Sequence, residues 1–293
     1  MPRNCAQSGW HAIRVNIRRD LENRSLTGKA YSIMYHDVFP EGQFKQGAFY
    51  TLSRAQFRVH LNALESLPFV SVKTCTEDWG SRAPVFITFD DGGEGSPWIA
   101  DELERHGWRG HFFVITNLIG TSGFVTADDV RMLARRGHIV GSHSCSHPDR
   151  MWSLSDTDLE HEWRDSAQIL TDLIGQPVDT ASVPGGFYSR RVGEAAVRAG
   201  IKHLFTSSPT ATTKRLGDGT VLGRYSVHRD TDVSRLASLA GGKAAGPRRQ
   251  QAILWEVKNI AKALGGDRYE ALRKVFLKFT MGVKRFKSQS TYN

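Results

Sequence analysis

Two short motifs hold the side chains with which this chain could do chemistry. Thr88-Phe-Asp-Asp-Gly92 contains two adjacent carboxylates, and His143-Ser-Cys-Ser-His147 contains two imidazoles. Two histidines four residues apart are a weak signal alone, but an Asp pair between an apolar run and a glycine rarely accompanies them by chance. Two neutral imidazoles and one carboxylate form a three-ligand set that suits zinc and leaves positions open for water and substrate. The second Asp is then free to act as a base, so the motifs predict a hydrolytic metal site.

The Asp pair directly follows a predicted strand. The β-branched and aromatic run at 83–89 is typical of a buried parallel strand, and Gly92-Gly93 lets the chain turn after the two carboxylates. Because successive strand side chains point to opposite faces, this break is what allows both carboxylates to lie at the strand's carboxyl end, where α/β folds place their active sites. Taken alone, the Asp pair has a second interpretation, an Asx turn that caps the next helix.

The histidine motif also follows a predicted strand. Its sequence is a poor helix former, and Pro148 disfavours the helical conformation at His147, so we expect both histidines on a tight loop. Along the chain, strands alternate with helices at the spacing of βα units, and Thr126 and Ser153 are predicted N-caps. The predicted strands lie near 31–36, 69–73, 84–89, 111–115, 138–142, 180–184, 202–206 and 221–227. The predicted helices lie near 53–66, 97–106, 126–136, 155–174, 189–199 and 232–240.

These motifs resemble those of a known family. Thr88–Gly92 and His143–Pro148 are similar to the first two motifs of the polysaccharide deacetylases, the NodB-homology carbohydrate esterases, and Tyr35-His36-Asp37 resembles the opening strand of their bacterial exopolysaccharide branch. The resemblance covers roughly residues 30–242. It implies an irregular (β/α) barrel, usually seven-stranded, that removes N-acetyl groups from amino-sugar polymers. It further implies that Asp90 is the general base and that Asp91, His143 and His147 bind one divalent metal ion, with zinc expected.

The third family motif is only partly present. The family usually has an Arg two residues before a proline to orient the base, and Ser182 stands at that position here, with Gly185 in place of the aromatic residue. The resemblance implies that the Gly185 N–H can still donate to an oxyanion, since this role needs no side chain. The orienting charge is absent unless Arg190 or Arg191 reaches back. From the same segment, the resemblance implies substrate contacts by Pro184, Gly186 and Tyr188.

The last family motif contributes a histidine as general acid, and His228 is the candidate because it lies near the end of the last predicted strand. Arg224 and Arg229 beside it indicate an exposed strand end, where a solvated histidine is equally expected. His36 ends the first predicted strand, where it either lines the mouth of the barrel or is an ordinary buried histidine.

We expect an N-terminal extension at 1–30, the barrel at 31–242 and a basic helical tail at 243–293, which its charge sets apart from the rest. The tail holds 12 Lys and Arg against 3 Asp and Glu, whereas the remainder carries equal numbers. Two amphipathic stretches, at 253–264 and 272–286, are expected in it. They either pack on the barrel with solvated basic faces or attach the enzyme to an anionic membrane surface or an acidic glycan. Nucleic acid is not expected as a partner, because no recognition motif accompanies the charge.

The sequence contains no apolar run long enough to span a bilayer and no apolar signal-peptide core near Met1, so we expect a cytoplasmic protein, with attachment to the inner membrane face as an option. The function that these observations favour is metal-dependent removal of acetyl groups from N- or O-acetylated sugars of a polysaccharide or its precursor. Two alternatives stay open. One is deacetylation or deformylation of a lipid-linked sugar, and the other is a catalytically silent carbohydrate-binding protein of a polysaccharide assembly system.

Overall fold

A computed structural model of the chain describes residues 28–43, 49–186 and 188–265. The chain divides into two compact units, Met1–Arg248 and Arg249–Asn293, and every described strand lies in the first. The predicted N-terminal extension, except for its last residues, and the second amphipathic stretch of the tail lie outside the described residues.

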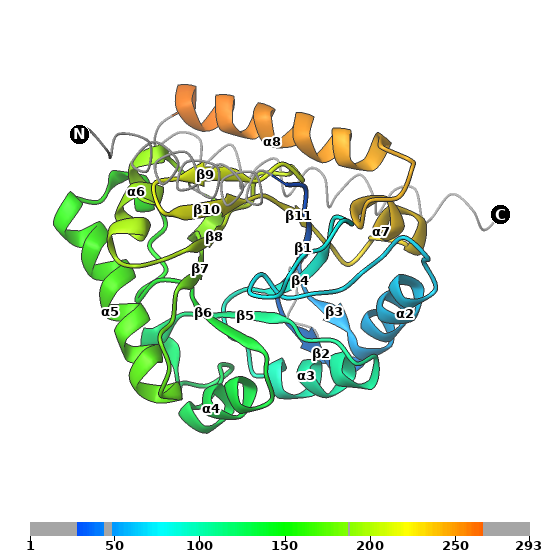
Figure 1. Cartoon of the computed structure of the whole chain (residues 1–293), viewed down its shortest axis with the longest axis horizontal. Helices are drawn as coiled ribbons and strands as arrows, with labels where there is room; N and C mark the ends of the chain where they lie inside the picture. Colours follow the sequence, from blue (N-terminus) through cyan, green and yellow to red (C-terminus); the bar gives the residue numbers. More distant parts are fainter. Residues whose placement is uncertain (1–27, 44–48, 187, 266–293) are drawn as a thin grey trace, which may run out of the picture. The chain divides into compact units, whose positions relative to one another are not determined.

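The first unit is built on one curved sheet whose strands surround a common centre, with helices outside (Figure 1). The order of its strands is β11-β1-β4-β5-β6-β7-β8-β10-β9, and all neighbours are parallel except β10 and β9. The strands are β1 (Tyr31–Tyr35), β4 (Val85–Phe89), β5 (His111–Val114), β6 (Ile139–Ser142), β7 (Thr180–Ser182), β8 (His203–Phe205), β9 (Lys214–Leu216), β10 (Gly219–Leu222) and β11 (Arg224–Ser226).

Gly223 explains how the sheet returns on itself. It is the single residue between β10, which pairs with β8, and β11, which pairs with β1. A Cβ at Gly223 would lie only 2.4 Å from the Ser208 carbonyl oxygen and 2.5 Å from that of Thr210, so no side chain fits there. Because β10 and β11 act as one interrupted strand, the ring has seven positions, and the predicted irregular barrel is confirmed. The prediction missed β9, which pairs only with β10.

Helices follow the strands at the predicted places, within two residues at each end. They are α2 (Arg54–Glu65), α3 (Ser96–Arg105), α4 (Ala127–Arg135), α5 (Asp156–Ile174), α6 (Arg190–Arg198) and α7 (Val233–Leu239), with α8 (Gly246–Gly265) running across the boundary of the two units. Thr126 caps α4 as predicted, in a reciprocal capping box with Asp129. The N-cap of α5 is Ser155 and not Ser153, because Ser153 belongs to the preceding 3₁₀ turn, η2 (Met151–Ser153), and its hydroxyl donates to the Arg150 carbonyl.

Two further differences concern short strands. The predicted strand at 69–73 is absent from the described sheet, where Val72 makes only an isolated bridge to Val85. A small parallel pair, β2 (Val38–Phe39) with β3 (Leu52–Ser53), was not predicted. Strands of two residues carry no periodicity that a sequence pattern could reveal.

The alternation of side chains on β4 separates the core from the interior of the barrel. Val85, Ile87 and Phe89 belong to the large apolar cluster beneath the helices, whereas Phe86 belongs to a smaller cluster with Phe113. Residues two apart on a strand face the same side, so the parity that points Phe86 inward also points Thr88 and Asp90 inward. The strand itself therefore delivers Asp90 to the interior of the barrel.

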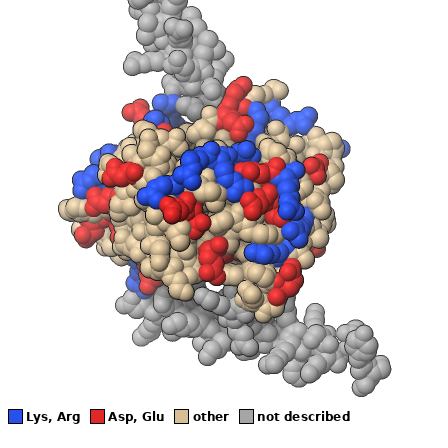
Figure 2. Space-filling model, turned by 90° about the horizontal axis from the view of Figure 1, so that it is seen from below, with Lys and Arg blue, Asp and Glu red and all other residues tan. Residues whose placement is uncertain are grey.

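The surface of the barrel carries mixed charge. On the face drawn in Figure 2, Lys and Arg side chains lie among those of Asp and Glu. Elsewhere among the described residues, Arg136 and Asp101 form an ion pair at 2.6 Å. On α8, the apolar side chains of Ile253, Leu254 and Val257 are exposed by 64%, 59% and 57%. None of the described helices combines the length and the apolar character needed to cross a membrane.

Candidate active site

Asp90 stands directly after β4 and is almost completely buried. Its backbone N–H donates to the Tyr35 carbonyl at 3.1 Å, which extends the pairing of β1 with β4 by one residue. The guanidinium of Arg224 on β11 donates to both carboxylate oxygens, from Nη1 to Oδ1 at 2.6 Å and from Nη2 to Oδ2 at 2.8 Å. This two-pronged geometry is the strongest form of a carboxylate–guanidinium hydrogen bond.

The same guanidinium is buried and makes further contacts inside the barrel. Arg224 is 0% exposed, its Nε donates to the Thr206 carbonyl at 3.2 Å, and its guanidinium lies 5.6 Å from the centre of the Phe113 ring. Burial alone would raise the pKa of Asp90, but the charges of Arg224 and His143 outweigh it and hold that pKa below its ordinary value. Asp90 is therefore an ionised carboxylate in a buried site.

Arg224 corrects two expectations. It is a buried residue and not part of an exposed strand end, and the charge that the third motif lacks comes from β11. Arg190 and Arg191 do not supply it, because they pair with Glu194 at 2.7 Å and with Asp156 at 2.6 Å on the outside of the molecule. The signal that was available is the position of Arg224, which stands inside the predicted strand at 221–227 and not at its end.

Ser182, which stands where the resemblance predicts an Arg, connects Asp90 to the histidine motif. Its hydroxyl lies 3.1 Å from Oδ1 of Asp90, to which it donates, and 2.6 Å from Nδ1 of His143. The same Nδ1 lies 3.0 Å from the Ser182 carbonyl oxygen. With a proton on Nδ1 donated to Ser182, the Nε2 of His143 keeps its lone pair for a metal ion.

Asp91, His143 and His147 come together as predicted. Each offers one ligand atom, and the three atoms lie within 4.8 Å of one another. Nε2 of His143 is 3.4 Å and Nε2 of His147 is 3.9 Å from Oδ1 of Asp91. Ligands about 2.0–2.2 Å from a tetrahedral zinc stand at similar separations, so the residues fit a metal ion after small adjustments. Burial alone would raise the pKa of Asp91, but its contacts with His143, His36 and His147 lower it.

The backbone of this set is held in an uncommon conformation. Asp91, Ser144 and His147 have φ angles of 75°, 65° and 55°, and no other non-glycine residue in the described ranges has a positive φ. Such conformations cost energy and persist where the surroundings enforce them, often at functional sites. The left-handed turn at Asp91 is what directs its carboxylate away from that of Asp90 and towards the histidines.

Glu162 of α5 fixes the loop between the two histidines. Its Oε2 accepts from the backbone N–H groups of Cys145 at 2.9 Å and Ser146 at 3.0 Å, and its Oε1 accepts from the Ser146 hydroxyl at 2.6 Å. The Ser144 hydroxyl accepts from the His147 N–H at 3.0 Å and closes the turn. Sequence reasoning missed Glu162, because no local pattern relates α5 to a loop that ends several residues before it.

The third motif forms a tight turn, η3 (Pro184–Gly186), beside this set. Gly185 and Gly186 adopt left-handed conformations, with φ angles of 60° and 70°. Pro184 is buried, and Tyr188 is half-buried and packs on Gly193 of α6. The roles of the Gly185 N–H and of these side chains in binding an oxyanion and substrate stay predictions.

His228 and His36 lie among aromatic side chains. The ring centre of His228 is 4.3 Å from that of Phe49 and 5.0 Å from that of Tyr50, and His36 is 4.7 Å from Tyr50. His36 also interacts electrostatically with both Asp90 and Asp91, and its Nδ1 is buried without a hydrogen-bond partner among the described atoms. The sequence singled out His228 as the acid; the structure adds His36 beside the carboxylates.

Comparison with known proteins identifies a domain within the chain. The family model described as polysaccharide deacetylase matches residues 79–204, a segment that includes Asp90, Asp91, His143, His147 and Ser182. Residues 79–204 therefore form a polysaccharide deacetylase domain. The family model covers less than half of the chain, and β1, β11 and therefore Arg224 lie outside the match.

Individual relatives match this chain over part of their length. An uncharacterised 30.6 kDa protein of Geobacillus stearothermophilus is 32% identical over 43% of this chain and 47% of its own length. A peptidoglycan-N-acetylglucosamine deacetylase of Bacillus cereus is 26% identical over 50% of this chain and 54% of its own. The chain thus spans about half the length of these two relatives. The crystal structure of a polysaccharide deacetylase from Bacillus cereus shares the fold, with a TM-score of 0.62, 22% identity and coverage of 73% of this chain and 69% of its own.

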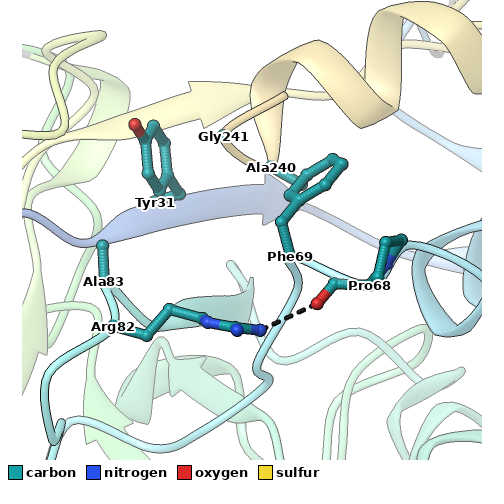
Figure 3. A pocket seen from close by; sticks show the side chains of 7 residues that line it. All are labelled: Tyr31, Pro68, Phe69, Arg82, Ala83, Ala240 and Gly241. Carbon is teal, nitrogen blue, oxygen red and sulfur yellow. Dashed lines mark hydrogen bonds between the residues drawn. The ribbon is translucent and has the colours of Figure 1, made fainter. Parts of the chain in front are cut away.

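A hollow of about 370 Å³ lies elsewhere on this barrel (Figure 3). It is lined by Tyr31 at the start of β1 and Ala83 before β4, together with Phe69 and Arg82, which donates to the Pro68 carbonyl at 2.7 Å. Strand starts and strand ends lie at opposite ends of parallel strands, so this hollow is separate from the Asp90 site.

Proposed function

We propose that this chain is a metal-dependent hydrolase that removes acetyl groups from N-acetylated sugars of a polysaccharide or its precursor. The observation that carries the proposal is the placement of an ionised, buried Asp90 beside the convergent ligand atoms of Asp91, His143 and His147. A base next to a three-ligand metal set is the arrangement that hydrolysis of an amide requires. The family assignment supports the same reaction, and the Bacillus cereus relative is named for it.

Asp90 takes the role of general base. A divalent ion held by Asp91, His143 and His147, with zinc expected, would polarise the acyl carbonyl and lower the pKa of a water. Asp90 accepts the proton of the attacking water. A carboxylate can accept about four hydrogen bonds, and Arg224 and Ser182 use three of these sites, so capacity for the water remains. Arg224 and Ser182 act as positioning residues because they fix the direction of both oxygens.

The remaining roles concern the oxyanion and the leaving amine. The Gly185 N–H is proposed to donate to the oxyanion, with Pro184, Gly186 and Tyr188 beside the acyl group. The leaving nitrogen needs a proton, and two histidines are candidates for the acid. His228 is the family-based candidate, and His36 is favoured by its electrostatic interaction with both carboxylates.

The two alternatives differ in what now supports them. The missing Arg of the third motif favours a catalytically silent protein, whereas the ion pair of Asp90 with Arg224 supplies the charge that this motif lacks and so favours an active one. Action on a lipid-linked sugar, or O-deacetylation, involves the same residues and differs only in substrate.

The basic tail supports a separate proposal, attachment to an anionic membrane surface or an acidic glycan. Residues 243–293 carry the excess of Lys and Arg, and Ile253, Leu254 and Val257 form an exposed apolar face on α8. Binding to anionic vesicles that weakens steeply between about 0.1 M and 1 M salt would support it, because screening shortens the reach of charge. Binding that is insensitive to salt would contradict it.

Acetate release tests the deacetylase proposal directly. The purified protein is incubated with N-acetylglucosamine oligomers as isolated, after chelation, and after chelation followed by zinc. We expect release that chelation abolishes and zinc restores. Release that continues unchanged after the bound metal has been removed would contradict metal dependence, and no release from N-acetylated, O-acetylated or formylated sugars would contradict the hydrolase.

A further inference from the structure

Three neighbouring strand ends form the rim of the barrel at the proposed site. Ser226 of β11 pairs with Met34 of β1, and Tyr35 of β1 pairs with Phe89 of β4. His228, His36 and Asp90 therefore follow one another across the rim, each just beyond the end of its strand. With neighbouring strands about 4.8 Å apart, the ends of β11 and β4 are separated by about 10 Å.

An aromatic cluster covers the rim beside Asp90 and Asp91. It comprises Phe49, Tyr50, His228 and His36, and its successive ring centres lie 4.3 to 5.6 Å apart. Phe49 and Tyr50 are exposed by 44% and 38%, which places them among the more exposed aromatic side chains of the described barrel. The cluster thus presents flat apolar surface to solvent at one side of the proposed metal site.

The position of these rings is fixed by the strand they neighbour. The Arg229 N–H donates to the Phe49 carbonyl at 3.1 Å, and the Arg229 guanidinium donates to the Thr51 hydroxyl at 3.2 Å. These bonds tie the segment at 49–51 to the end of β11, so the exposed rings belong to the rim.

We propose that Phe49 and Tyr50 form a subsite that stacks on the pyranose ring next to the unit being deacetylated. The C–H face of a pyranose is apolar while its hydroxyl groups point outward from the edge, so a flat aromatic side chain can bury that face and leave the hydroxyls in water. The rings pack on His36 and His228, which lie one and two strand spacings from Asp90, so they reach a sugar one or two units along a chain. The inference rests on the proposed function and deepens it, because the substrate becomes an oligomer or polymer of N-acetylated hexosamine.

The test compares Phe49→Ala and Tyr50→Ala with a control at the other end of the barrel. Phe69 is an exposed aromatic residue of the hollow in Figure 3, at the amino-terminal ends of the strands, and Phe69→Ala removes a similar area without touching the rim. For each protein, kcat and KM for acetate release are measured with N-acetylglucosamine and with its tetramer. Binding of the tetramer to chelated protein is measured by calorimetry.

We expect the wild type to prefer the tetramer, and Phe49→Ala to lose about tenfold in kcat/KM for the tetramer, through KM, because one stacked ring contributes about that factor. The rate on the monomer and both rates of Phe69→Ala should not change. If acetate is released but Phe49→Ala keeps the full tetramer preference, or loses monomer and tetramer alike, the subsite is wrong and the deacetylase stands. If the wild type releases no acetate yet binds the tetramer in a Phe49-dependent way, the deacetylase is wrong and the subsite stands. If wild type and Phe49→Ala bind the tetramer equally, the subsite is wrong.

Discussion

Asp90 and Asp91 are neighbours in the sequence and opposites in the structure. The Asp90 carboxylate is almost fully buried and receives three hydrogen bonds, two of them from one guanidinium. The Asp91 carboxylate is 38% exposed, stands on a left-handed backbone and faces two imidazoles, 3.4 Å and 3.9 Å away. Arg224 neutralises the charge of Asp90, which forms one half of the site. In the other half, the ligand atoms of Asp91, His143 and His147 face one another.

This contrast distinguishes Asp90, the proposed base, from Asp91 and the two histidines, the proposed metal ligands. A buried carboxylate needs a permanent counter-charge, which Arg224 provides. A cation would stabilise three ligand atoms that lie this close together, and the strained conformations of Asp91 and His147 indicate that the fold enforces this arrangement. Variants that affect the two halves differently test the separation.

The largest effect on catalysis is expected from Asp90→Asn. The substitution removes the base and keeps the shape, so activity should fall by about 10²–10⁴-fold. The metal ligands are untouched, so metal content should stay near that of the wild type. Turnover close to the wild-type value would show that another group accepts the proton.

Arg224→Met should chiefly destabilise the protein. It leaves the Asp90 charge buried without its partner, a change that costs about 3–5 kcal/mol in comparable sites. The double variant Asp90→Asn with Arg224→Met should recover most of that loss in urea unfolding. Because the pKa of Asp90 is depressed in the fold, its contribution should be complete above the ordinary carboxyl pKa and disappear as pH falls towards the folded-state value. Equal stability of Arg224→Met and wild type would refute the buried pair.

Glu162→Gln should weaken metal binding without affecting the base. A neutral amide cannot accept the three bonds from Cys145 and Ser146 as strongly, so metal affinity should fall by about 10–100-fold, as for other supporting residues. Glu160→Gln is the matched control on the same helix, since Glu160 pairs with Arg198 on the surface. Competition with a fluorescent chelator measures both, and unchanged affinity in Glu162→Gln would show that the loop holds its shape unaided.

The smallest effect is expected from His228→Ala. The His228 ring packs on Phe49 and Tyr50, whereas His36 interacts electrostatically with the carboxylates of Asp90 and Asp91. We therefore expect kcat to fall a few-fold in His228→Ala and much more in His36→Ala. The reverse order would restore His228 as the general acid.

The sequence was sufficient for elements whose pattern is local. A short sequence pattern predicts the strand before Asp90, the glycine break after Asp91 and the two histidines. The bounds of the helices with clear amphipathic spacing were predicted within two residues. Arg224 and Glu162 were missed because their roles depend on which strands and helices become neighbours. Gly223 illustrates the same limit, since its role as the joint between β10 and β11 follows from the closure of the ring.

Metal content tests the central claim most directly. The protein as purified should hold about one divalent ion per chain, and Asp91→Ala, His143→Ala and His147→Ala should each hold almost none, because three-ligand sites rarely survive the loss of one ligand. Asp149→Ala is the control, an exposed carboxylate two residues from His147 that lies outside the set. Elemental analysis of folded protein should separate the three variants from wild type and control. Near one ion per chain in all five proteins would contradict the assignment of this site.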